Sequence, residues 1–325
     1  MSSTILKNNK PIDVDSLPRF SAPATFMRLP HTETAKGLDI GIFGVPFDGG
    51  TTNRPGARHG PREIRTASSM QRTYNLATGV EPYEICNFGD IGDVPINPLD
   101  QHHSLIEIQS FCEEIIRENC LPIAVGGDHL VSLPLLRALG DPSLGLIHLD
   151  AHSDTGDYDF TQTKYSHGTP FRRAIEERLL DPQKIVQVGI RGSSNSSEEL
   201  EWAVAQGITI IGMDQFHQLG VEGVSAMIRE VVGNAPVYLT FDIDCFDPAF
   251  APGTGTPEAG GLTSYEGLNL LRRMRGLNFQ GADLVEVCPP LDSSGITSIL
   301  GATVLFEICC LLAESRQKGV SGYAG

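Results

Sequence analysis

Short apolar runs alternate with longer amphipathic stretches from about residue 38 to the end of the chain. Such short runs are typical of strands buried on both faces of a sheet, and the longer stretches repeat with the period of a helix. The stretch 103–118, for example, has apolar residues at Leu105, Ile108, Cys112, Ile115 and Ile116. The pattern therefore predicts strands and helices that alternate along the chain.

The elements can be placed approximately from these runs. The predicted strands span residues 38–44, 84–88, 121–125, 144–150, 184–189, 208–212, 237–242 and 282–287. The predicted helices span residues 61–74, 103–118, 130–139, 169–178, 197–206, 223–232 and 263–275, followed by an apolar C-terminal helix around 299–312. The segment 263–266 has the form of a capping box. Strict alternation predicts a parallel sheet covered by helices on both faces. A closed eight-stranded barrel is the alternative, and the uneven strand spacing favours the open sheet.

Three polar segments follow predicted strands, at the edge where open α/β sheets bind ligands. The first, 124–129, has two glycines that allow a tight turn before Asp128 and His129. The second contains Asp150, His152 and Asp154, and the third contains Asp242 and Asp244 before a loop rich in proline and glycine. Side chains two positions apart on a strand share one face, so each segment directs its polar groups to one place.

Four aspartates at the ends of apolar strands would be close together and partly buried, where repulsion and burial disfavour their ionisation. Few lysines or arginines adjoin them, so two divalent metal ions are the natural counter-charge. We predict that one ion is bound by His129, Asp150, Asp154 and Asp242, and the other by Asp150, His152, Asp242 and Asp244. Asp150 and Asp242 would then bridge ions about 3.5–4 Å apart. Oxygen-rich ligation without thiolate favours Mn²⁺, with Ni²⁺ or Co²⁺ as alternatives.

Three nearby residues receive other interpretations. We expect His148, one step deeper in its strand than Asp150, to be a hydrogen-bonded core histidine. Asp128 is interpreted as a turn residue or a neighbour of the ligands, and Cys245 as a packing residue.

Composition narrows the partners and the location. The net charge of −16 argues against a nucleic-acid partner, because an acidic surface repels phosphate. Seven cysteines without zinc-ribbon spacing indicate reduced core residues of a cytoplasmic protein. Residues 1–10 lack the apolar stretch of a signal peptide. The apolar segment 299–312 is interrupted by Glu307 and falls short of the roughly 20 residues that cross a bilayer, so we expect no membrane role.

The three polar segments resemble the metal-binding motifs of the ureohydrolase (arginase/agmatinase) family. They read Gly-Gly-Asp-His at 126–129, Asp-Ala-His-Ser-Asp at 150–154 and Asp-Ile-Asp-Cys-Phe-Asp-Pro at 242–248. The resemblance covers about residues 35–315. It implies a three-layer α/β/α sandwich with a mainly parallel eight-stranded sheet, a binuclear manganese site, and hydrolysis of a guanidino group to urea and an amine. It also implies a homotrimer or homohexamer. We expect one catalytic domain at 35–318, an N-terminal extension at 1–34 and a tail at 319–325.

Longer stretches resemble the agmatinase and guanidinobutyrase branch of that family, notably 53–61, 167–173, 251–257 and 286–290. His167 resembles the family histidine that relays a proton to the leaving amine, and histidine suits that task near neutral pH. Glu286 would pair with the planar guanidinium, and Asp154 would also orient the attacking water. The alternative for His167 is a histidine in a surface loop, and the alternative for Glu286 is a structural salt bridge or a helix cap. One departure is Leu130, where the family often has serine, and it removes no ligand.

The tail of the substrate is less well defined by the sequence. Asp157 and Arg191 are the candidate contacts, while the loop 155–166 offers both acidic groups and Lys164. The arginines in 54–58 and 168–173 favour a guanidino acid such as 4-guanidinobutyrate. Agmatine is the next candidate, and guanidine, alkylated guanidines and formiminoglutamate remain open. Two other classes are a single-zinc deacetylase, which needs fewer ligands, and a non-catalytic subunit of a mixed oligomer, which usually lacks some of them.

Overall fold

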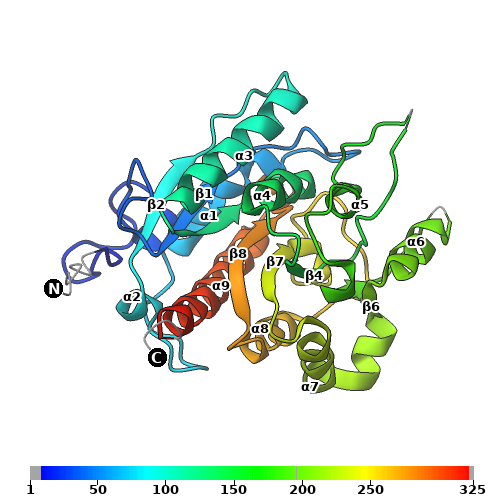
Figure 1. Cartoon of the computed structure of the whole chain (residues 1–325). Helices are drawn as coiled ribbons and strands as arrows, with labels where there is room; N and C mark the ends of the chain where they lie inside the picture. Colours follow the sequence, from blue (N-terminus) through cyan, green and yellow to red (C-terminus); the bar gives the residue numbers. More distant parts are fainter. Residues whose placement is uncertain (1–8, 161, 195, 322–325) are drawn as a thin grey trace.

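One sheet forms the centre of the molecule. The computed structural model describes residues 9–321 except 161 and 195. Eight strands are hydrogen-bonded in the order β2-β1-β3-β8-β7-β4-β5-β6, and all seven pairs are parallel (Figure 1). They span Ile40–Gly44 (β1), Phe88–Asp93 (β2), Leu121–Val125 (β3), Gly145–Leu149 (β4), Ile185–Ile190 (β5), Thr209–Gly212 (β6), Pro236–Asp242 (β7) and Asn278–Val285 (β8). Because β2 and β6 are edges, the sheet is open, as predicted.

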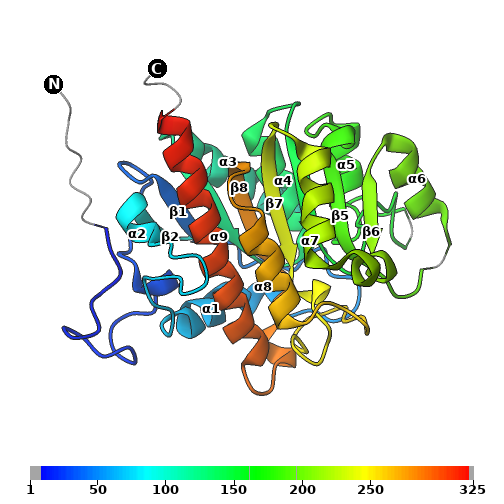
Figure 2. The same ribbon diagram turned by 90° about the horizontal axis from the view of Figure 1, so that it is seen from below.

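Helices cover both faces of the sheet, which confirms the predicted three-layer α/β/α sandwich. One apolar cluster joins the sheet to α1 (Gly60–Ser68), α2 (Pro82–Ile85), α7 (Met213–Val232), α8 (Ser264–Arg273) and α9 (Ile296–Ser321). Figure 2 shows α7, α8 and α9 side by side on this face. The other cluster includes side chains of α3 (Gln101–Arg117), α4 (Ser132–Leu139), α5 (Pro170–Glu176) and α6 (Glu198–Gln206). The predicted capping box is present at the start of α8, between Thr263 and Glu266.

The prediction was wrong for the strand at 84–88, because β2 begins at Phe88 and residues 82–85 form α2. The β2 sequence is not an apolar run, since it contains Asp90, which is 1% exposed. Arg65 of α1 donates two hydrogen bonds to the Asp90 carboxylate, at 2.8 and 3.0 Å, and so satisfies its charge inside the core. Because this buried ion pair allows a charged residue inside β2, the hydrophobic pattern did not indicate the strand.

Helix α9 is longer than the predicted 299–312. The segment Ile296–Lys318 is long and apolar enough to cross a membrane, with a mean hydropathy of 2.1, but 83% of its most apolar window is buried in the protein. It packs against β8, α1 and α8, which is the setting of a core helix. The helix also continues to Ser321, and residues 322–325 of the predicted tail lie outside the described residues.

The predicted N-terminal extension is partly built into the same core. Phe26, Met27 and Leu29 are buried in the cluster that contains α9. Residues 1–8 of the extension lie outside the described residues.

Candidate metal centre

The three predicted metal-binding segments meet at the carboxyl ends of strands in the middle of the sheet. His129 follows β3, Asp150 and Asp154 follow β4, and Asp242 ends β7. The turn after β3 needs glycine, because a Cβ at position 127 would lie 1.8 Å from the carbonyl oxygen of Phe47. This tight crossing delivers His129 to the centre of the sheet edge.

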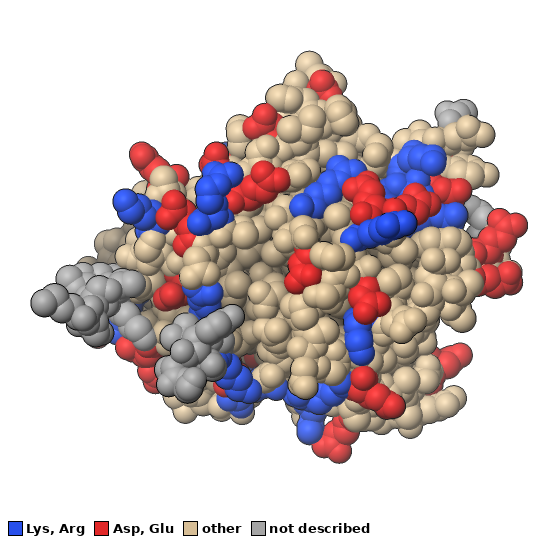
Figure 3. All heavy atoms as spheres, in the orientation of Figure 1, with Lys and Arg blue, Asp and Glu red and all other residues tan. Residues whose placement is uncertain are grey.

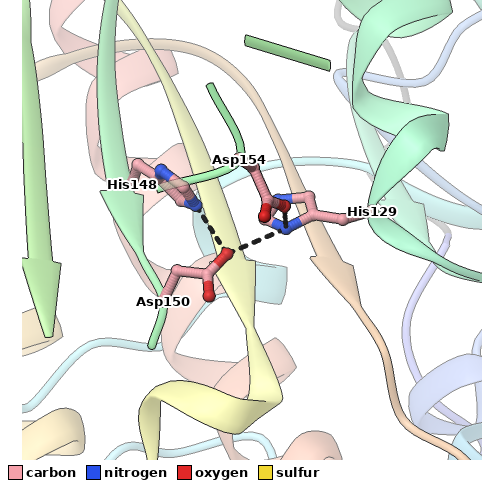
Figure 4. Close-up of side chains that lie close together, drawn as sticks. All are labelled: His129, His148, Asp150 and Asp154. Carbon is pink, nitrogen blue, oxygen red and sulfur yellow. Dashed lines mark hydrogen bonds and ion pairs between the residues drawn. The ribbon is translucent and has the colours of Figure 1, made fainter. Parts of the chain in front are cut away.

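The first group of ligands surrounds one nitrogen atom. His129 Nδ1 lies 3.0 Å from Asp150 Oδ2, 2.9 Å from Asp154 Oδ2 and 3.2 Å from Asp242 Oδ2. Figure 4 shows Asp150 and Asp154 turned toward the imidazole of His129. All four side chains are at least nine-tenths buried. The structure therefore brings together the four residues predicted for the first ion.

The second group shares Asp150 with the first. His152 Nδ1 lies 3.1 Å from Asp244 Oδ2 and 3.4 Å from Asp150 Oδ1. Ligand atoms of Asp150, His152 and Asp244 can all lie within 4.8 Å of one another, the spacing that one metal ion requires. Asp150 thus belongs to both groups, as its predicted bridging position requires. Asp242 joins the first group through His129 and is linked to Asp244 by the Asp244 N–H, which donates to Asp242 Oδ1 at 2.8 Å.

The charge of this cluster calls for cations. Burial, with the negative charges of Asp244 and Asp150, raises the pKa of Asp242 well above its ordinary range. His129 Nδ1 is buried and makes no hydrogen bond of good geometry, although three carboxylate oxygens surround it. An unpartnered buried nitrogen facing three carboxylates fits a cation placed among them, since such groups are otherwise costly to bury. The donor set of imidazole and carboxylate suits divalent ions such as Mn²⁺, Co²⁺ and Ni²⁺.

A hydrogen-bond chain holds the ring of His129 from behind. His129 Nε2 lies 2.8 Å from Thr240 Oγ1, and the Thr240 hydroxyl donates to Asp283 Oδ1 at 2.6 Å. The hydroxyl has one proton, which it gives to Asp283, so it must accept the Nε2–H of His129. This leaves the Nδ1 lone pair directed at the three carboxylates. Chains of this kind fix the tautomer of a metal-binding histidine.

A second chain holds Asp150. Gln187 Nε2 donates to His148 Nδ1 at 3.1 Å, so the proton of His148 is on Nε2, which donates to Asp150 Oδ2 at 2.7 Å. His148 and Gln187 are fully buried. His148 is therefore the hydrogen-bonded core histidine that the sequence predicts. It also orients a carboxylate that both ligand groups share.

His167 and Glu286 lie together beside this cluster. His167 Nδ1 is 2.9 Å from Glu286 Oε1, and Thr52 Oγ1 is 2.9 Å from His167 Nε2. Glu286 Oε1 also accepts the main-chain N–H of His129 at 3.0 Å. Burial opposes the charge of His167, but the hydrogen bond to Glu286 and its negative charge raise the pKa of His167 to about 9.

Two of these residues have an unusual main-chain conformation. Glu286 has φ 62° and Asp154 has φ 50°, in the left-handed region that residues other than glycine rarely adopt. Such strained positions persist where the surroundings determine them, often in active sites.

The other predicted site residues have mixed outcomes. Asp157 lines the cavity next to the cluster, and Arg173 Nη2 donates to its Oδ1 at 2.8 Å. Arg191 also lines this cavity, but all three of its guanidinium nitrogens donate to main-chain carbonyl oxygens, at 2.7–3.3 Å. This arrangement argues against the predicted contact between Arg191 and substrate. Its guanidinium instead ties the loop after β5 to the loops after β7.

Several residues of the site were not found in the sequence. Thr52, Gln187 and Thr240 contact His167, His148 and His129 respectively, and Asp283 accepts the hydroxyl of Thr240. Gln187, Thr240 and Asp283 are polar residues inside apolar strands, and that signal could have indicated them. Asp128 is the turn residue expected, and its carboxylate accepts the N–H groups of Leu130 at 3.0 Å and Gly50 at 2.6 Å. Cys245 is fully buried, as a packing residue should be.

An open α/β sheet with buried imidazoles and carboxylates at its carboxyl edge is typical of a protein that binds divalent metal ions there. The arginase family model matches residues 38–310. The chain is 53% identical over 310 residues to the guanidinopropionase of Pseudomonas aeruginosa, covering 95% of this chain and 98% of that protein. It is 45% identical to the guanidinobutyrase of the same organism, with 94% and 97% covered. Among solved structures, proclavaminate amidinohydrolase from Streptomyces clavuligerus aligns with a TM-score of 0.87 and 42% identity over 92% of this chain and 99% of that chain. The chain therefore belongs to the arginase family, and it is a metal-dependent amidinohydrolase.

Proposed function

We propose that this protein hydrolyses a short ω-guanidino acid to urea and the corresponding amino acid. The site observation that carries the proposal is that the acidic metal-binding cluster and the carboxylate of Glu286 open onto one cavity of about 940 Å³. A carboxylate beside a metal centre suits a planar, cationic guanidinium group. Sequence identity of 53% with a guanidinopropionase and of 45% with a guanidinobutyrase supports a substrate tail that ends in a carboxylate. We place 3-guanidinopropionate first and 4-guanidinobutyrate second.

The residues of the cavity have complementary tasks in this reaction. When bound, two divalent ions would supply a water molecule of lowered pKa as the nucleophile. Glu286 Oε1 is occupied by His129 N–H and His167, so Oε2, which has no hydrogen-bond partner among the described residues, accepts the N–H groups of the guanidinium. Asp154 accepts a hydrogen bond from the attacking water and orients it toward the guanidinium carbon.

His167 completes the reaction by protonating the leaving amine. Its raised pKa, about 9, keeps a proton on the imidazole near neutral pH. The contact with Glu286 places that proton beside the carboxylate that holds the guanidinium. Protonation allows the C–N bond to break with release of a neutral amine and urea.

The test is urea release from a panel of guanidino compounds. The purified chain is loaded with Mn²⁺, Ni²⁺ or Co²⁺ and incubated with 3-guanidinopropionate, 4-guanidinobutyrate, agmatine and guanidine. We expect the highest kcat/KM for one of the two acids. A higher kcat/KM for agmatine or guanidine would contradict the proposal. No urea from any compound with every metal, while metal binding is intact, would instead favour a non-catalytic subunit.

We further propose Mn²⁺ as the resident metal, a homotrimer or homohexamer as the assembly, and the cytoplasm as the location. Oxygen-rich ligation supports the choice of metal. Cys112, Cys120, Cys245, Cys288, Cys309 and Cys310 are buried free thiols, which supports a reducing compartment. Metal analysis of protein purified without added metal, light scattering in solution and fractionation of the source cells test these three points separately.

A further inference from the structure

The cavity at the metal centre has few groups that could meet a negatively charged substrate tail. Among the described residues that line it, only Arg172 and Arg191 carry a permanently cationic side chain. Arg191 is committed to main-chain carbonyl oxygens through all its nitrogens. Lys164, another basic residue of this region, is exposed and does not line the cavity. A carboxylate tail therefore has one available cationic partner.

Arg172 is held in place by an aromatic platform. Arg172 lies in α5, five residues after His167, and both residues line the cavity. Its Cζ atom lies 4.4 Å from the centre of the Trp202 ring, which belongs to α6 and also lines the cavity. A guanidinium stacked on an indole ring loses little further side-chain entropy when it binds a ligand, and its edge stays free to donate hydrogen bonds.

The acidic groups next to Arg172 are mainly bound by its neighbour. Arg173 donates to Asp157 at 2.8 Å and to Glu176 at 3.0 Å, and its side chain is only 4% exposed. Arg172 is more distant from both, with Nε 3.3 Å from Glu176 and Nη2 3.5 Å from Asp157. Within the described residues, Nη1 of Arg172 has no hydrogen-bond partner. Figure 3 shows basic and acidic side chains interleaved over the region of α5.

We propose that Arg172, stacked on Trp202, binds the tail carboxylate of the substrate and gives the site its preference for guanidino acids over guanidino amines. The inference rests on the proposed function. With the guanidinium of the substrate at Glu286, the tail extends into the cavity that Arg172 and Trp202 also line. Such a contact forms equally in the ground state and in the transition state, so its loss raises KM and leaves kcat nearly unchanged.

The experiment compares Arg172→Gln with the native chain on three substrates that differ in the charge of the tail. These are 3-guanidinopropionate, the neutral propylguanidine and the cationic agmatine. For the acid we expect KM to rise about 10- to 100-fold in the variant, the loss typical of a charge-assisted hydrogen bond. For propylguanidine we expect little change, and for agmatine a lower KM. Inhibition by the product β-alanine should weaken in parallel, and metal content should be unchanged.

Two further variants separate the charge from the packing. Arg172→Lys keeps the charge but not the flat fork, so we expect a smaller rise in KM than with Gln. Arg137→Gln is the matched control, because it removes a cation that pairs with Glu177 at 2.7 Å outside the cavity. It should leave all three substrates unaffected.

The outcomes distinguish this inference from the proposed function. An unchanged KM for the acid in Arg172→Gln, or an equal rise for the acid and propylguanidine, overturns the role of Arg172 while guanidino-acid hydrolysis stands. If the native chain prefers agmatine, the proposed function fails first. If Arg172→Gln does not fold, Arg172→Lys and Trp202→Leu give the same test, since either should raise KM selectively for the acid.

Discussion

The hydroxyl of Thr240 offers a sharp test of how the metal centre is held. It accepts from His129 Nε2 at 2.8 Å and donates to Asp283 Oδ1 at 2.6 Å, and all three residues are buried. Thr240→Val keeps the shape of the side chain and removes the hydroxyl. His129 Nε2–H then loses its acceptor, and the imidazole is free to turn or to adopt the other tautomer. The Nδ1 lone pair is no longer held toward Asp150, Asp154 and Asp242.

The magnitude follows from the two groups left without a partner. Each buried unpaired group costs about 1–3 kcal/mol, so the two together would cost about 2–6 kcal/mol of unfolding free energy. Asp283 keeps the hydroxyl donors Ser132 and Tyr238 on its other oxygen, which places the cost in the lower part of this range, at about 2–4 kcal/mol. At roughly 2 °C per kcal/mol for a chain of this size, Tm should fall by about 4–8 °C. Loss of a group that orients a metal-binding histidine costs about 10- to 100-fold in metal affinity.

The assay is a competition for Mn²⁺ between the protein and a chelating dye, with thermal unfolding of the metal-free protein measured in parallel. Thr240→Ser is the matched control, because it keeps the hydroxyl and loses a methyl group. It should bind metal nearly as tightly as the native chain. The reasoning would be refuted if Thr240→Val bound Mn²⁺ within about twofold of the Ser variant. A loss of affinity in both variants would instead indicate packing as the cause.

Three other variants test the metal centre and the fold. Asp242→Ala should abolish metal loading and activity and leave a folded chain, and metal analysis with circular dichroism checks this; undiminished turnover would defeat the metal assignment. His167→Gln should lower kcat far more than metal affinity, and an equal loss of both would indicate a ligand role. Because the pKa of His167 is raised from 6.5 to about 9, the stability that its charge contributes in the metal-free protein is fully present below pH 6.5 and is lost as the pH rises through 9. The difference in Tm between the native chain and His167→Gln should therefore shrink over that range, and a constant difference would mean that the pair acts without charge. Thr263→Ala removes the capping box of α8 and should cost about 0.5–2 kcal/mol in urea unfolding, with kcat/KM unchanged.

The cluster of candidate ligands could be predicted because its signal is local. Asp150, His152 and Asp154 alternate at the end of one apolar strand, and Asp242 and Asp244 do the same at another. Their spacing alone directs them to one side, and charge repulsion then calls for cations. The parallel sheet followed from the same pattern of short runs, and the uneven spacing of those runs favoured the open form.

The remainder depends on contacts between distant parts of the chain. Thr52 meets His167 across 115 positions, and no pattern near either residue indicates the pair. Arg191 has the charge expected of a residue that binds a carboxylate, yet main-chain carbonyl oxygens of the loops after β7 accept the hydrogen bonds of its guanidinium. The strand β2 was misplaced because Asp90 is satisfied by Arg65, a partner in another element. In each case tertiary structure decides what the local sequence leaves open.

The order of strands in the sheet has a consequence for how the enzyme matures. β8 and β7 are the last strands in the sequence but lie at the centre, between β3 and β4. The two outer halves, β2-β1-β3 and β4-β5-β6, therefore share no strand pairing until the final third of the polypeptide has been synthesised. His129 and Asp150 belong to different halves, so a nascent chain on the ribosome cannot gather its metal ligands early. Chains cut short before β7 would expose two unpaired strand edges and should aggregate.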